Sequence, residues 1–101
     1  MLSPNLSGEK STFFKRRDGI VYCRFRPRLE TLTWHSGAEH TVFQVPSWAQ
    51  SAVKFMAKAR GIWSIAAVQD LVYRDDVLAL DQLIGRLVKV GFLETSLPPE
   101  E

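Results

Sequence analysis

Basic side chains and one tyrosine recur at alternate positions in the first third of the chain. Successive residues of a β-strand point to opposite sides, so alternate positions share one face. Lysine and arginine on such a face could bind phosphates while the tyrosine ring stacks on a base. A solvated sheet face whose charges prevent edge-to-edge pairing would carry the same residues. The residues with this pattern are Lys15, Arg17, Tyr22, Arg24 and Arg26.

A second set of polar side chains falls on the outer side of a helix predicted over residues 77–90. Gln82, Arg86 and Lys89 occupy that side, and glutamine and arginine are side chains that read base edges in DNA. Two aspartates directly before the helix, and Asp81 on it, would repel phosphate. These acidic side chains favour a partner other than duplex DNA. Duplex DNA stays the alternative partner.

Residues suited to metal binding or nucleophilic catalysis are few. His35 and His40 flank a predicted turn and could face each other across a hairpin, and Cys23 is the single cysteine. The three lack the C-x-x-C spacing that is typical of a zinc site. The chain also lacks a G-x-S-x-G elbow and a glycine-rich phosphate loop. We therefore expect a non-enzyme with no catalytic residue, metal or cofactor of its own.

The hairpin that would carry the basic face is predicted from two β-prone runs, residues 11–17 and 20–25. Between them, Asp18-Gly19 is a strong hairpin signal, because a type I′ turn needs positive φ at both of its central residues. Such a turn would place Lys15 opposite Tyr22 on neighbouring strands.

Two further strands are expected at residues 29–35 and 40–45, and three helices follow them. Ser47 and Gln50 have the spacing of a capping box at the start of the first helix. The second helix is expected over residues 65–72. The three tryptophans are predicted to be core residues where the sheet meets the helices.

The last third of the chain has the clearest pattern. Apolar residues recur at i, i+3, i+4 and i+7 from Val77 to Val88, which predicts an amphipathic helix with one buried face. Gly91 can take the left-handed conformation that ends a helix, and Phe92-Leu93 would re-enter the core as a short strand. This order is typical of the end of a winged-helix domain. We therefore predict an α+β winged helix-turn-helix fold, with a small antiparallel sheet followed by three helices and a short final strand.

The 101 residues are enough for one domain, which we place at residues 10–94 between disordered tails at 1–9 and 95–101. The formal net charge is only +2, but residues 1–46 hold 7 basic and 4 acidic side chains, whereas residues 47–101 hold 6 and 7. A single cysteine fits a reducing compartment. No run approaches the roughly 20 apolar residues of a membrane span, and the N-terminal region lacks the apolar segment of a signal peptide. A cytoplasmic protein is therefore expected.

A wider pattern of apolar positions spans residues 12–94 and ends in Gly91-Phe92-Leu93. It includes the run Phe14-Lys15-Arg16-Arg17 with Tyr22, and residues 40–46, 53–60, 63–71 and 83–94. In this pattern the chain resembles the C-terminal winged-helix module of cupin-type (JmjC-like) iron/2-oxoglutarate oxygenases. The His-x-Asp/Glu pair of that family's iron site is absent here. The resemblance therefore implies the accessory module, which in that family supports dimerisation or partner contact.

A sheet followed by three helices and a terminal glycine-apolar pair is also similar to the small PqqD-like peptide-recognition domains of peptide-modifying pathways. Those domains hold an extended leader peptide as an added strand beside their third strand and third helix. The resemblance implies that residues 40–45 and 77–90 would line such a site here.

We interpret the chain as a non-catalytic recognition module for a protein or peptide, accessory to a modifying enzyme such as a cupin-type oxygenase. The eight basic, tyrosine and glutamine side chains on the predicted strand face and on the helix over residues 77–90 would contact that partner, and a dimer is compatible with this role. The alternative is a DNA-binding transcriptional regulator that uses residues 13–26 and 77–90. Salt separates the two, because DNA binding weakens steeply as salt rises.

Overall fold

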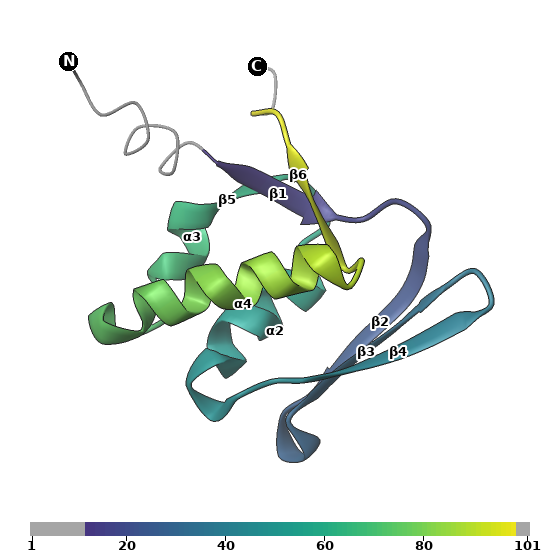
Figure 1. The fold of residues 1–101 in the computed structure, drawn as a ribbon, viewed down its shortest axis with the longest axis horizontal. Coiled ribbons are helices and arrows are strands. Elements are labelled where there is room, and N and C mark those ends of the chain that lie inside the picture. The colour runs from purple at the N-terminus through teal and green to yellow at the C-terminus, as the bar shows by residue number, and fades with distance from the viewer. Residues whose placement is uncertain (1–11, 99–101) are drawn as a thin grey trace.

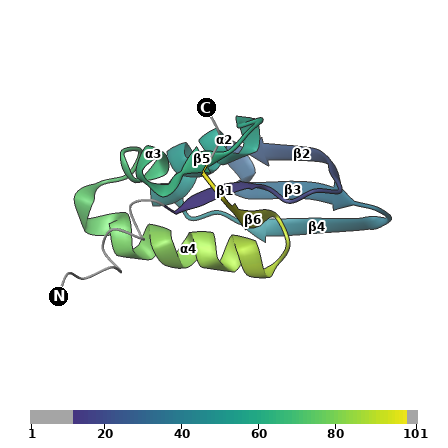
Figure 2. The same ribbon diagram turned by 90° about the horizontal axis from the view of Figure 1, so that it is seen from above.

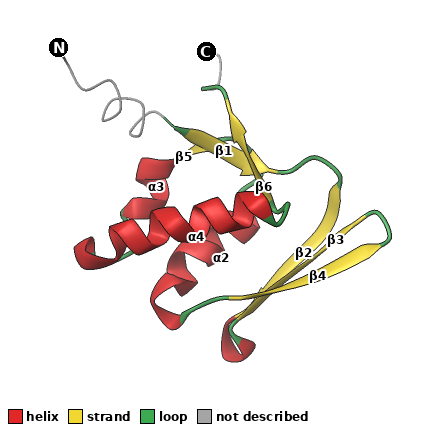
Figure 3. Ribbon diagram, in the orientation of Figure 1, coloured by secondary structure: helices red, strands yellow, loops and turns green. Residues whose placement is uncertain are grey.

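The computed structural model describes residues 12–98 and shows a mixed α+β fold with two small antiparallel sheets and three helices (Figure 1). The helices are α2 (Gln50–Lys58), α3 (Ile65–Gln69) and α4 (Val77–Lys89). The strands are β1 (Phe13–Arg16), β2 (Ile20–Arg26), β3 (Thr31–Ser36), β4 (Glu39–Gln44), β5 (Trp63–Ser64) and β6 (Leu93–Ser96). Short 3-10 turns, η1 (Pro27–Leu29), η2 (Ser47–Ala49) and η3 (Arg74–Asp76), precede β3, α2 and α4. Figure 3 shows the helices gathered at one end of the molecule and the β2-β3-β4 sheet at the other.

The predicted hairpin around Asp18-Gly19 is wrong. β1 pairs with β5 and β6, whereas β2 pairs with β3, so the chain crosses from one sheet to the other at this point. The turn itself forms, with Gly19 at a φ of 99°. The strands separate because Phe14 is buried against Trp63 of β5, with the ring centroids 5.4 Å apart. The single sheet expected from the sequence is therefore two three-stranded sheets, β5-β1-β6 and β2-β3-β4.

The β2-β3-β4 sheet leaves both of its outer strands open. β3 and β4 form the predicted hairpin, with His35 opposite His40. β2 pairs with the other side of β3, and a bulge interrupts the register between Ile20 and Tyr22. Figure 2 shows α2 on the side of β2 and α4 on the side of β4.

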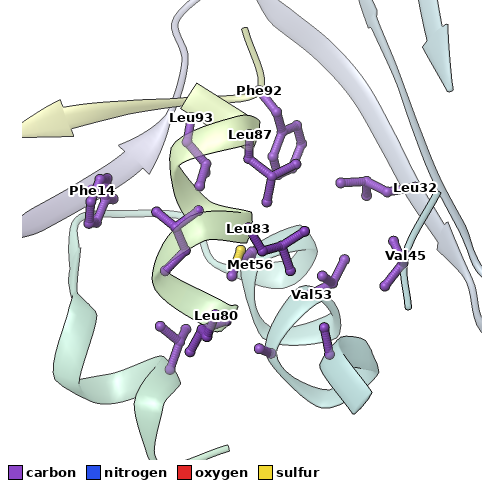
Figure 4. Packing of buried hydrophobic residues seen from close by; sticks show 14 of the residues in the cluster. Phe14, Leu32, Val45, Val53, Met56, Leu80, Leu83, Leu87, Phe92 and Leu93 are labelled. Carbon is purple, nitrogen blue, oxygen red and sulfur yellow. The ribbon is translucent and has the colours of Figure 1, made fainter. Parts of the chain in front are cut away.

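Both sheets and all three helices contribute to one hydrophobic core (Figure 4). Trp34 of β3 lies against Phe92, with ring centroids 4.9 Å apart, and this contact links the second sheet to the end of α4. Trp34 and Trp63 are 1% and 6% exposed, so their prediction as core residues is confirmed. Trp48, in η2, is only partly buried at the margin of this core.

The end of α4 agrees with the sequence prediction. The buried face of the helix consists of Leu80, Leu83, Ile84 and Leu87. Gly91 has a φ of 94°, its N–H donates to Val88 O at 3.2 Å, and the N–H of Phe92 donates to Leu87 O at 2.9 Å. These two bonds form a Schellman motif, which satisfies carbonyl groups at the helix end. β6 then continues through Ser96, two residues past the domain end that the sequence predicts.

The start of α2 differs from its prediction. The N-cap is Ala49, after the 3-10 turn η2, and no side-chain capping bond forms there. Instead of closing a capping box with Ser47, the side-chain amide of Gln50 donates to Pro27 O at 3.5 Å. This contact ties the first turn of the helix to the end of β2.

Candidate functional site on the β2 edge

β2 is an edge strand, and part of its backbone faces away from β3. Hydrogen-bonded and non-hydrogen-bonded pairs alternate along an antiparallel ladder. The loop of the β3–β4 hairpin is two residues long, at 37–38, and the residues that flank it bond to each other. From this pair onward, the backbone groups of successive β3 residues bond alternately to β4 and to β2. This alternation makes Thr33 of β3 and Arg24 of β2 a hydrogen-bonded pair. The backbone N–H and C=O groups of Cys23 and Phe25 consequently point to the free edge.

α2 runs beside this edge and leaves two adjoining hollows between itself and β2. Their volumes are about 810 and about 340 Å³, and both are lined by Cys23, Ala57 and Lys58. We call the two hollows together the β2 groove. Its other lining residues are Arg16, Val21, Tyr22, Arg24, Phe25, Pro27, Lys54 and Arg60.

Positive charge dominates the β2 groove. Lys54 and Lys58 lie one turn apart on α2, Arg60 follows the helix, and Arg24 belongs to β2. These four residues are exposed, and none of the residues that line the groove is acidic. An extended segment with negative charge is therefore the ligand that complements this surface.

Arg16 holds α2 in place at the wider end of the groove. Its Nη2 donates to the carbonyl oxygens of Ala57 at 2.7 Å and Ala59 at 3.1 Å, so the guanidinium caps the C-terminus of α2. Its positive charge also suits the negative end of the helix dipole. The Nε atom is buried and has no hydrogen-bond partner among residues 12–98. Arg16 therefore positions the wall of the groove.

Cys23 contacts the same helix end. Its Sγ donates to Ala57 O at 3.4 Å. Burial raises the pKa of the Cys23 thiol, and the charge of Arg16 offsets this only in part, so the thiol is a poor nucleophile at neutral pH. Cys23 also faces the opposite side of the sheet from His35 and His40. In the described part of the chain, no three His, Cys, Asp or Glu side chains come together as a possible metal site.

The outer face of the β2-β3-β4 sheet carries a row of rings. The centroid of Tyr22 lies 5.7 Å from that of His35, which in turn stacks on His40 at 4.5 Å. Because β2 is regular from Tyr22 onward, Arg24 and Arg26 project from this same face. The sequence prediction that these three β2 residues share a face, and that the two histidines face each other, is confirmed.

Lys15 and Arg17 do not join that face, because the crossing at residues 18–19 places them with the other sheet. The Nζ of Lys15 lies 3.2 Å from a carboxylate oxygen of Glu94 and 3.5 Å from one of Asp18. The hydrogen bond to Glu94, assisted by the charge of Asp18, raises the pKa of Lys15. Arg17 lies beside the end of α4, where its Nη1 would be 3.3 Å from a Cβ added at Gly91.

Gln82, Arg86 and Lys89 are exposed on α4, as the helical periodicity predicts. α4 lies on the β4 side of the sheet, away from the β2 groove (Figure 2). The eight side chains proposed from the sequence therefore fall on three separate surfaces. These are the face of the β2-β3-β4 sheet, the region where β1 meets the end of α4, and the outer side of α4.

Besides Arg16, three exposed basic residues of the groove were not predicted as site residues. Lys54 and Lys58 have the i, i+4 spacing of a solvated helix face, and Arg60 lies just beyond the helix. Only the packing of α2 beside β2 brings them together with Arg24. The i, i+4 pair of lysines was the one visible signal, and it did not indicate which strand the helix would adjoin.

No family model, curated protein or solved structure matches this chain. Within residues 12–98, no helix has the length and apolar character needed to cross a membrane.

Proposed function

We propose that this protein is a non-catalytic recognition module that binds an extended, acidic segment of a partner protein in the β2 groove. The observation that supports this most is the free edge of β2 beside a groove with four exposed basic side chains and no acidic one. A peptide that pairs with β2 would satisfy the outward backbone groups of Cys23 and Phe25. Main-chain hydrogen bonds of this kind supply the affinity in strand addition.

Side-chain selectivity would come from the alternation of the bound strand. One row of peptide side chains would lie toward α2, where carboxylates would form charge-assisted hydrogen bonds with Lys54 and Lys58. The other row would lie beside Tyr22 and Arg24. A peptide with acidic residues at every second position is therefore the best match.

The fold and the two family resemblances support a partner-binding role, but the peptide-recognition resemblance implies residues 40–45 and 77–90, at the other edge of the sheet, as the site. The α3–α4 pair followed by β6 supports a winged-helix relation, in which α3 and α4 would be the helix-turn-helix. Both families that the chain resembles use such a module for partner contact, which favours a partner in a peptide- or protein-modifying system. The single, free cysteine, Cys23, supports a cytoplasmic setting.

An NMR titration of the ¹⁵N-labelled protein tests this function directly. The ligand is an eight-residue peptide that alternates valine and glutamate, with both ends blocked. We expect the largest shifts at Cys23, at Phe25 and in residues 54–60. The same peptide with glutamine in place of glutamate should bind at least about tenfold more weakly, because the groove then lacks complementary charge.

Two charge-matched variants separate the groove from the net charge of the protein. Lys54→Gln/Lys58→Gln should lose most of the affinity, whereas Arg86→Gln/Lys89→Gln, which removes the same charge from α4, should retain it. Equal losses would show that net charge alone attracts the peptide. Shifts confined to β4 and α4 would place the peptide at the other edge of the sheet, and either result would overturn the proposal.

The alternative function, DNA binding by a transcriptional regulator, is favoured by the exposure of Gln82, Arg86 and Lys89 on α4. The basic hairpin that would have completed that site does not form, because β1 and β2 lie in different sheets. A mixed-sequence duplex should shift resonances of α4 at low salt and lose this effect as salt rises. An excess of duplex that leaves α4 unshifted would rule this function out.

A further inference from the structure

The outer face of the β2-β3-β4 sheet combines stacked rings with positive charge. Tyr22, His35 and His40 form a row across the three strands, with successive centroids 5.7 and 4.5 Å apart. Beside the row, Arg24 and Arg26 project from successive outward positions of β2, about 7 Å apart along the strand. None of the strand residues that project from this face is acidic.

This composition differs from that of an ordinary solvated sheet face. Surfaces that only need to stay soluble intersperse charges of both signs and expose few large apolar groups. Here Tyr22 is 49% exposed and Val42, on the same face of β4, is 58% exposed. Aromatic and apolar side chains exposed together beside charge of a single sign indicate a binding surface.

We propose that this face binds single-stranded nucleic acid. His35 lies between the other two rings, so bases would stack on the outer ring faces of Tyr22 and His40 at the two ends of the row. The phosphates would contact Arg24 and Arg26. Every base has a π-face, so a row of rings recognises an unpaired strand with little dependence on sequence. In a duplex those faces are covered by neighbouring bases, so this surface selects unpaired strands.

The same geometry argues against a peptide on this face. Ladder hydrogen bonds lie in the plane of the sheet, so the face offers an extended peptide no backbone partners. The peptide function belongs to the edge of β2, and the nucleic-acid surface is a second site that borders it. Tyr22 and Arg24 adjoin both surfaces, whereas Arg26 and His40 lie outside the groove lining.

Fluorescence anisotropy with a fluorescein-labelled ten-nucleotide oligouridine tests the proposal. His40→Ala should weaken binding about fivefold to 150-fold, the range for losing one ring from a base stack. His40→Phe keeps a ring at this position and should retain binding. Arg26→Gln should weaken binding and reduce its salt dependence. Arg74→Gln removes an exposed charge in η3, outside both the sheet face and the groove, and should bind within about twofold of the unmodified protein.

An abasic strand of the same length and charge separates stacking from simple electrostatics. We expect it to bind at least about tenfold more weakly than oligouridine. Equal binding of the abasic strand, or an equal loss in Arg26→Gln and Arg74→Gln, would overturn the proposal. Loss of binding in folded His40→Phe, with ¹⁵N spectra verifying the fold, would do so too. None of these outcomes affects the peptide titration, which reads Cys23 and Phe25 on the groove side.

Discussion

Replacing Arg16 with methionine tests whether the wall of the β2 groove is held in place as the structure indicates. Methionine keeps most of the length of the side chain but cannot donate to Ala57 and Ala59, whose carbonyl oxygens accept bonds of 2.7 and 3.1 Å from Nη2. The C-terminus of α2 would then lose its side-chain cap. We expect a marked loss of stability and a looser contact between α2 and β2.

The size of the effect follows from these contacts. Two hydrogen bonds from a charged donor contribute about 3–6 kcal/mol together, and attraction to the helix dipole adds about 0.3–1 kcal/mol. Part of this is recovered, because methionine removes the buried Nε that has no partner in residues 12–98, a group that costs about 1–3 kcal/mol. Water that hydrogen-bonds to the freed carbonyl groups at this half-buried helix end recovers more. The free energy of unfolding should therefore fall by about 2–3 kcal/mol, or about 10–20 °C in Tm.

Urea unfolding followed by tryptophan fluorescence measures this change. Arg28→Met is the matched control, because Arg28 is exposed in η1 and its loss should change the free energy of unfolding by less than about 0.5 kcal/mol. Arg16→Lys keeps the charge but not the planar fork, so it should lie between the two. If Arg16→Met is as stable as Arg28→Met, α2 needs no cap from β1, and the reasoning about the groove wall fails.

Two further predictions concern glycine positions and the single thiol. Gly91→Ala should destabilise the protein by about 1–2 kcal/mol because its φ is 94°, whereas Gly85→Ala, with open space around the added Cβ, should stabilise it by about 0.5–1 kcal/mol. Urea unfolding measures both variants. Changes of the same sign would contradict the left-handed backbone at Gly91 and the ordinary helical backbone at Gly85. Burial raises the pKa of Cys23, so alkylation by iodoacetamide should reach its half-maximal rate above the usual thiol pKa of about 8.5. As pH rises, the Cys23 thiol ionises in the unfolded chain before it ionises in the folded protein. The stability that the neutral thiol contributes is therefore fully present below about pH 8.5 and is lost as pH rises through the folded pKa. Cys23→Ser should lessen this dependence of the free energy of unfolding on pH. An alkylation rate that levels off below pH 8.5 would contradict the burial argument.

The C-terminal part of the fold was predictable because its signals are local. The apolar spacing of α4, the glycine at its end and the apolar pair that follows all act within residues 77–93. The β3–β4 hairpin was predictable for the same reason, since its partners adjoin one short turn.

The placement of β1 was not predictable from local sequence. Asp18-Gly19 correctly indicated a turn, but it could not indicate whether the flanking strands pair with each other. β1 instead pairs with β5 and β6, which are far along the chain, because that arrangement buries Phe14. Long-range burial overrode a short-range hairpin signal, and the error moved Lys15 and Arg17 to the wrong surface.

The candidate site was predictable only in the part that depends on strand alternation. Period-two spacing placed Tyr22, Arg24 and Arg26 on one face, and the structure agrees. The β2 groove depends on which helix packs beside which strand, and nothing in the sequence of Lys54 or Lys58 specifies that. A site formed between elements is therefore harder to predict than a face formed within one.

The charges around β2 also bear on which partners the edge accepts. A free edge is a template for pairing with any other strand, and lysines beside it are a common means of preventing self-association. Two copies paired through β2 would bring the lysines and arginines of both grooves together, which disfavours that dimer. An acidic strand meets the opposite sign and is attracted. The basic groove would thus exclude a second copy of the chain and admit an acidic partner, so protection of the edge and recognition by it need not be separate functions. β4 lies at the other edge, contains no lysine or arginine and exposes Val42, so this edge lacks the protection that the basic groove gives to β2.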